Sequence, residues 1–253
     1  MDYQSAYFEF LCRLGDNALI LGHRISEWCG HGPTLEEDIA LANIALDLIG
    51  EATVWLELAA GVENKRRTAN DLAMLRDAWE FRNVLLVEQP NGDFGQTIMR
   101  QYLFDAWHVL VLTALAESRE LPVAAAAAKI KKEAQYHLLR SRNTVIGLGD
   151  GTPESHRRMQ AALDWSYPYV GELFERDEID HTVEQKGVVN QSANLWDHYY
   201  EEISSTLQRA TLQIPAAPHS HSGGKNGQQH SEHLGHILTQ LQWLQRAYPG
   251  AQW

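Results

Sequence analysis

Cysteine is scarce in this chain, since its 253 residues include only Cys12 and Cys29. If both lie on one helix, their offset of seventeen residues places their Cα atoms roughly 25 Å apart, which is too far for a disulfide. A secreted scaffold held together by disulfides is therefore excluded. Two free thiols are typical of a protein in a reducing cytosol.

Positive charge is also in short supply, with 21 Lys and Arg residues against 33 Asp and Glu and a net charge of −12. Nucleic-acid binding needs a basic surface, so such a partner is excluded. The N-terminus lacks the basic and apolar regions of a signal peptide, and no apolar run approaches the roughly eighteen residues of a membrane span. We expect a soluble, acidic, cytoplasmic protein without a membrane partner.

The alternation of apolar and polar residues that marks β-strands is nearly absent, whereas spacings of three and four recur. A stripe of this kind runs from Tyr7 to Trp28. We expect four long helices, in two hairpins, within the first 150 residues, and shorter helices after them. The sequence therefore predicts an all-α four-helix bundle with accessory helices. It is expected to be a single domain over residues 1–253, with the core bundle at about 3–148 and the accessory helices at about 152–247.

Local signals place several helix ends. Thr34 and Glu37 predict a capping box at the start of the second helix, which Gly61 is expected to stop. Thr152-Pro153 predicts the start of another helix, with a cap followed by proline at the first helical position. A shorter helix is expected over Asn70–Val84.

The stretch Ile39–Gly50, IALANIALDLIG, carries two polar side chains, Asn43 and Asp47, which share one helical face. A helix so apolar elsewhere is expected to lie buried among other helices. A carboxylate there is costly unless it is paired, protonated or bound to a metal. Asp47 is thus either a buried acid paired with a basic residue or part of a metal site.

A di-iron bundle takes a carboxylate from each of two helices and a Glu-x-x-His motif from each of the other two. Oxygen and imidazole ligands suit iron, and four carboxylates balance the charge of two irons. Each of the four expected long helices offers residues at such places. In chain order the candidate positions are Asp16 or Asn17, Asp47, Gly50, Asp105, His108, Glu133 and His137.

These positions fall short of a complete ligand set. Gly50 stands where the second helix would supply a histidine, and Tyr136 stands three residues after Glu133. With Asn17 on the first helix, four carboxylates and two histidines cannot be assembled at regular spacing. The pattern predicts an incomplete di-iron site.

Several candidates also have a structural explanation. Asp16 or Asn17 can sit at the edge of the apolar stripe, and His108 can be a core histidine bonded to Asp105. Glu133 lies among lysines and can belong to an exposed, salt-bridged face. His137 follows the inward face of its helix, but one histidine does not define a site.

Two features near the C-terminus are candidate binding sites. Histidines crowd one region, but such a loop is usually solvated with adventitious metal affinity. The glycine-rich patch Gly223–Gly227 contains a lysine but lacks the GK[ST] ending of a P-loop, so phosphate binding there is a weak hypothesis. The histidines are His219, His221, His230, His233 and His236.

Six segments of the chain resemble the phenylacetyl-CoA 1,2-epoxidase family, and within it the structural C-type subunits. The resemblance runs along essentially the whole chain. The segments are RLGDNALILGHRISEWCGHGPTLEEDIALANIALDLIGEA, LLVEQPNGDF, MRQYLFDAWH, KEAQYHLLRS, FERDEID and GGKNGQQHSEHLG.

The resemblance implies a ferritin-like fold and a supporting role. It implies that a partner catalytic A-type subunit holds the di-iron centre and epoxidises phenylacetyl-CoA in aerobic phenylacetate degradation. It also implies that a reductase subunit supplies electrons from NADPH, and that this chain has no cofactor of its own. Asn17, Asp47, Gly50, Asp105, His108, Glu133 and His137 would then be vestigial metal positions.

Two other functions stay open at this point. One is a catalytically active di-iron oxygenase with irregular ligands from Asp105, His108, Glu133 and His137. The other is an acyl-CoA binding or storage module without chemistry.

Overall fold

The computed structural model describes residues 1–189, 195–216 and 221–251, and within these ranges the chain forms helices and no strand. The all-α prediction is therefore confirmed. The helices fall into two compact units. The single domain expected over residues 1–253 stays a prediction. Unit 1 comprises Met1–Pro90, Arg176–Val183 and Ser222–Trp253, and unit 2 comprises Asn91–Glu175 and Glu184–His221.

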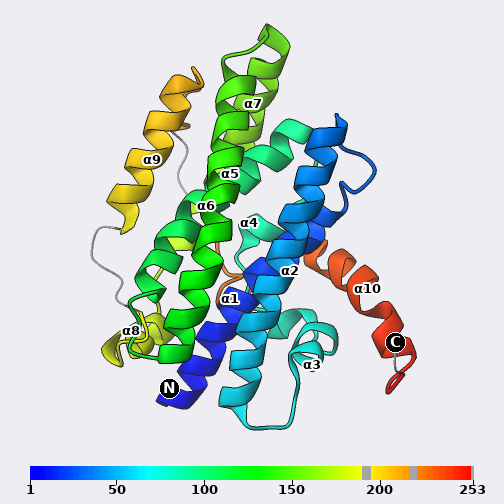
Figure 1. The fold of residues 1–253 in the computed structure, drawn as a ribbon, viewed down its shortest axis with the longest axis vertical. Coiled ribbons are helices and arrows are strands. Elements are labelled where there is room, and N and C mark those ends of the chain that lie inside the picture. Colours follow the sequence, from blue (N-terminus) through cyan, green and yellow to red (C-terminus); the bar gives the residue numbers. More distant parts are fainter. Residues whose placement is uncertain (190–194, 217–220, 252–253) are drawn as a thin grey trace. The chain divides into compact units, whose positions relative to one another are not determined.

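Unit 1 is built on a hairpin of two long helices, α1 and α2, which lie side by side in Figure 1. Two glycines of α1 let α2 approach closely. A Cβ atom on Gly15 would lie 2.8 Å from the Leu56 side chain, and one on Gly22 would lie 3.1 Å from Leu48. The order of these contacts makes the pair antiparallel. The elements are α1 (Tyr3–Ser26), α2 (Leu35–Glu63), α3 (Ala69–Met74), η1 (Ala78–Glu80), α4 (Leu85–Glu88), most of α8 (Glu178–Gln185) and α10 (Glu232–Ala247).

Unit 2 is built on a second hairpin, α5 and α6, against which α7 and α9 pack. Side-chain caps set two of its helix starts, because Asp93 accepts from the Gln96 N–H and Thr152 accepts from the Ser155 N–H. The predicted start at Thr152-Pro153 is confirmed. The elements are α5 (Phe94–Leu115), α6 (Leu121–Gly149), α7 (Pro153–Ser166), η2 (Tyr167–Phe174) and α9 (Leu195–Arg209).

Other predicted helix ends are partly right. Thr34 caps α2 by accepting from the Glu37 N–H. The helix passes Gly61 and ends at Glu63, where Asn64 takes the left-handed conformation with φ of 56°. The helix expected over Asn70–Val84 is wrong, since only α3 and the short η1 form there.

The expectation that the Asp47 stretch lies buried on all sides is also wrong. On α2, Ile39 and Leu46 are 53% and 66% exposed, Gly50 is exposed and Asp47 is half-buried. The helix buries only the side that packs on α1, so its other apolar residues form an outward face. Apolar character alone does not say which sides of a helix its own chain covers.

Among the described helices, α2 is long and apolar enough to cross a membrane, which corrects the expectation that no such run exists. Part of this apolar surface is buried against α1, since 44% of the apolar stretch of α2 is buried within the chain. One helix of this kind is weak evidence for a membrane span.

Candidate functional site

Asp105 is the centre of a buried polar cluster between α5 and α6, and only 1% of it is exposed. The Gln101 amide donates to Oδ1 over 2.7 Å, and the Ser141 hydroxyl donates to Oδ2 over 2.7 Å. Both oxygens of the carboxylate are therefore engaged by neutral donors of the protein. Gln101 and Ser141 were not predicted, although each lies four residues from a candidate, Asp105 and His137 respectively, on the same helical face.

His108 and His137 are buried beside this carboxylate. Burial raises the pKa of Asp105 from its ordinary 3.8 to about 6, while His137, the two hydrogen bonds and His108 act in the opposite direction. The His108 ring packs on Phe104, with 5.2 Å between the ring centroids. The structure thus brings together three of the predicted residues. His108 is buried, as expected of a core histidine, and its bond to Asp105 stays a prediction.

Glu133 and Tyr136 lie on the outer side of α6. Glu133 is half-buried and Tyr136 is 57% exposed. Among the residues that the structure describes, Glu133 makes no hydrogen bond to the Asp105 cluster. Glu133 is therefore not part of the hydrogen-bonded Asp105 cluster in the part of the chain that the structure describes.

Asp16 and Asn17, on α1, bind the segment that follows α3 in unit 1. The Asp16 carboxylate is fully buried, forms an ion pair with Arg76 and accepts from the Arg82 N–H over 2.8 Å. The Asn17 side-chain oxygen accepts from the Val84 N–H over 2.8 Å. Because these two side chains satisfy backbone donors of the segment, it needs no helical hydrogen bonds there. This is why the predicted helix is broken.

These donors do not fit a di-iron centre. Asp16 is neutralised by its ion pair with Arg76, and each Asp105 oxygen accepts one hydrogen bond, from Gln101 or from Ser141. Gly50 offers no ligand, and Asp47 stands on the partly exposed side of α2. Within residues 1–189, 195–216 and 221–251, no group of three or more His, Cys, Asp or Glu is arranged to hold a metal ion.

A second set of buried charges holds the segment Ser222–Ser231, which we call the C-terminal strap. Lys225 donates to Asp180 over 2.7 Å, and Arg13 forms ion pairs with Asp180 and Asp177. Burial alone would raise the pKa of Asp177, but the hydrogen bonds and charge of Arg13 hold it well below its usual range. The glycine-rich patch is therefore a packed structural loop.

The strap is also fixed at its far end, where His230 and the Ser231 N–H bond to the Glu88 carboxylate. These pairings were not predicted, although the strings FERDEID, LLVEQPNGDF and GGKNGQQHSEHLG contain their residues. Of the histidines considered as a metal loop, His230 is engaged with Glu88, and His219 lies outside the described residues.

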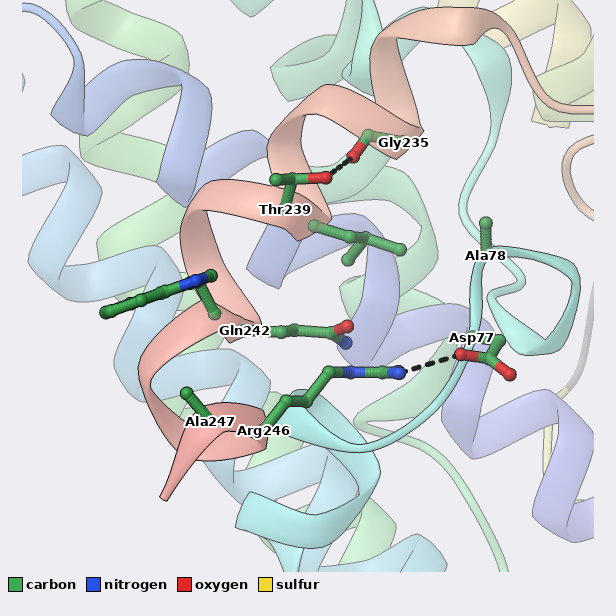
Figure 2. A pocket seen from close by; sticks show the side chains of 9 residues that line it. Asp77, Ala78, Gly235, Thr239, Gln242, Arg246 and Ala247 are labelled. Carbon is green, nitrogen blue, oxygen red and sulfur yellow. Dashed lines mark hydrogen bonds and ion pairs between the residues drawn. The ribbon is translucent and has the colours of Figure 1, made fainter. Parts of the chain in front are cut away.

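A hollow of about 490 Å³ lies between α10 and η1, as Figure 2 shows. Arg246 closes one side of it through an ion pair of 2.9 Å with Asp77, and Thr239 donates to the Gly235 carbonyl. Gln242 is tied to the backbone by bonds to the Ala73 and Arg76 carbonyls. The polar groups shown here are thus engaged within the protein.

Two comparisons with known proteins show the family to which this chain belongs. The model of the family described as "Phenylacetic acid catabolic protein", whose members have a ferritin-like helical fold, matches residues 1–253. The chain is 46% identical over 244 residues to the C-type subunit of 1,2-phenylacetyl-CoA epoxidase from Escherichia coli (strain K12), and the match covers 96% of this chain and 98% of that protein. The chain therefore belongs to the phenylacetic acid catabolic protein family and has its ferritin-like fold.

Proposed function

We propose that this chain is a non-catalytic, structural subunit of a phenylacetyl-CoA 1,2-epoxidase that works in aerobic phenylacetate catabolism. The observation that carries the proposal is the Asp105 carboxylate, whose two oxygens accept hydrogen bonds of 2.7 Å from Gln101 and Ser141. Two irons need about four carboxylates, and among the residues that the structure describes no group of three or more His, Cys, Asp or Glu is arranged to hold a metal ion. The kinship with a protein named as a C-type epoxidase subunit supports the same role.

The proposal includes a cytoplasmic complex in which a catalytic A-type subunit holds the di-iron centre and a reductase subunit brings electrons from NADPH. We assign the outward face of α2 to the catalytic subunit. Ile39, Asn43, Leu46 and Gly50 follow one another at spacings of four, three and four, which suits packing against another helix. Exposed apolar side chains of this size mark protein–protein contact surfaces.

Co-expression with the catalytic subunit tests this assignment. Leu46→Asp on α2 should abolish co-elution in gel filtration, because it buries an unpaired charge in the contact. Leu139→Asp on α6 is the matched control, since Leu139 is 52% exposed and lies in unit 2. Separate peaks for the two unaltered proteins would overturn the proposed complex.

Iron analysis separates the proposal from its alternatives. The chain purified alone should hold no stoichiometric iron and should not oxidise phenylacetyl-CoA. An active di-iron oxygenase would instead hold about two irons per chain. Saturable binding of phenylacetyl-CoA to the isolated chain would favour the acyl-CoA binding module.

A further inference from the structure

The C-terminal strap is held on unit 1 by contacts of two kinds. At the start of the strap, Gly224 packs so closely that a Cβ atom on it would lie 2.4 Å from the Asn83 carbonyl oxygen. The next residue, Lys225, forms an ion pair with Asp180. The Lys225 carbonyl also accepts from Arg13 over 3.0 Å. The charges of lysine and arginine persist throughout the physiological pH range. This half of the strap is therefore insensitive to pH near neutrality.

The other half depends on a histidine whose two ring nitrogens both face acceptors. His230 Nδ1 lies 2.9 Å from Glu88 Oε2, and Nε2 lies 3.2 Å from the Phe81 carbonyl oxygen. A neutral imidazole has one N–H and one lone pair, whereas an imidazolium has two N–H groups. Only the imidazolium can donate to an ionised carboxylate and a carbonyl at once. When Glu88 is ionised, this geometry therefore requires a charged His230.

The Glu88 carboxyl group is surrounded by hydrogen-bond donors. It is fully buried and also accepts from the Asn83 amide over 3.1 Å and the Ser231 N–H over 2.5 Å. His230 adds a positive charge in direct contact with the same carboxylate.

Other charged side chains near the pair bind other atoms than the Glu88 carboxylate or are more exposed to solvent. Arg24 of α1 donates to the Glu88 backbone carbonyl over 2.9 Å, and Arg82 bonds to Glu9. Glu232 and His233 follow on α10, where the first is exposed and the second half-buried. His230 is therefore a titratable group in direct contact with the Glu88 carboxylate.

We propose that the strap is a proton-dependent latch, closed when His230 carries its second proton and opened when that proton is lost. Deprotonation would place a lone pair of the ring against Glu88 or the Phe81 carbonyl in a buried position. The closed state is therefore present below the titration of His230 and is lost as pH rises through it. Opening frees α10, which follows the strap directly and packs on α1, α3 and α4.

Hydrogen exchange of the whole chain, corrected for the intrinsic effect of pH, tests the latch. Amides of residues 222–247 should exchange at least about tenfold faster at about pH 8.5 than at about pH 6, because a hydrogen bond to a charged group is lost. Amides of the α5–α6 hairpin should keep their protection. Equal protection of the strap at both pH values would overturn the proposal.

Two variants and one spectroscopic measurement sharpen the test. His230→Gln and Glu88→Gln should each speed exchange of the strap at low pH and remove its pH dependence, whereas His233→Gln should behave as the unaltered chain. Nitrogen NMR of the unaltered protein reports the ring directly. Both His230 nitrogens should be protonated at about pH 6, and a neutral tautomer there would refute the latch even if the variants fail to fold.

Discussion

Ser141 of α6 donates a hydrogen bond of 2.7 Å to Asp105 of α5, across 36 residues of sequence. The bond joins the two helices of one hairpin, and a shift of either helix by one residue would break it. Buried hydrogen bonds of this kind favour one helix register, although the Gln101 Oε1 atom of the cluster has no hydrogen-bond partner among the described residues. The cluster therefore links α5 to α6 through buried hydrogen bonds.

Asp105→Asn should lower the free energy of unfolding by about 1–3 kcal/mol at about pH 5. At that pH the folded carboxyl is mostly protonated and has one O–H to place, whereas the amide has two N–H groups, one of which is left without an acceptor. Urea denaturation with a helical signal measures the change. Glu133→Gln on α6 is the control and should change stability by less than about 0.5 kcal/mol. An equal loss in both variants would contradict the assigned role of Asp105.

The free energy of unfolding should change with pH because the pKa of Asp105 differs between the folded and unfolded chain. The pKa of Asp105 is raised in the folded state from 3.8 to about 6, so between these values the folded chain binds more protons than the unfolded one. Its contribution to stability therefore falls as pH rises from about 4 to about 7, by a total on the order of 3 kcal/mol. The Asp105→Asn variant should lack this fall. Urea denaturation of both proteins over this pH range measures the difference. A parallel pair of profiles would refute the raised pKa.

Arg76→Met should destabilise the chain by about 3–5 kcal/mol, because it leaves the buried Asp16 carboxylate without its cation. Arg157→Ala, which removes an exposed ion pair with Glu154, should give no measurable change. Both are measured by denaturant unfolding. A small effect of Arg76→Met would mean that Asp16 is stabilised by backbone donors alone.

Much of the helical framework follows from local sequence. The three- and four-residue spacings predicted the long helices of both hairpins, and Thr34 and Thr152 marked two starts correctly. These signals are local because caps and periodicity act within a few turns. Asn64 shows the limit, since its left-handed conformation and not Gly61 ends α2.

The site and the outward face of α2 could not be predicted in the same way. Asp16 pairs with Arg76, and Glu88 with a histidine 142 residues later, and neither spacing has a periodic signature. Leu46 is as apolar as a core leucine but is 66% exposed. A sequence shows that a residue is apolar but not whether its own chain or another molecule covers it.

The division of unit 1 along the chain has a consequence for biosynthesis. Its first part ends at Pro90, but its last part begins at Ser222, so Glu88 lacks His230 until nearly the whole chain has left the ribosome. The α5–α6 hairpin is emitted in between and can pack from local contacts. Unit 1 therefore completes its folding last, although its first helix is made first, and a nascent chain stalled before Ser222 would carry an unfinished surface for chaperones to recognise.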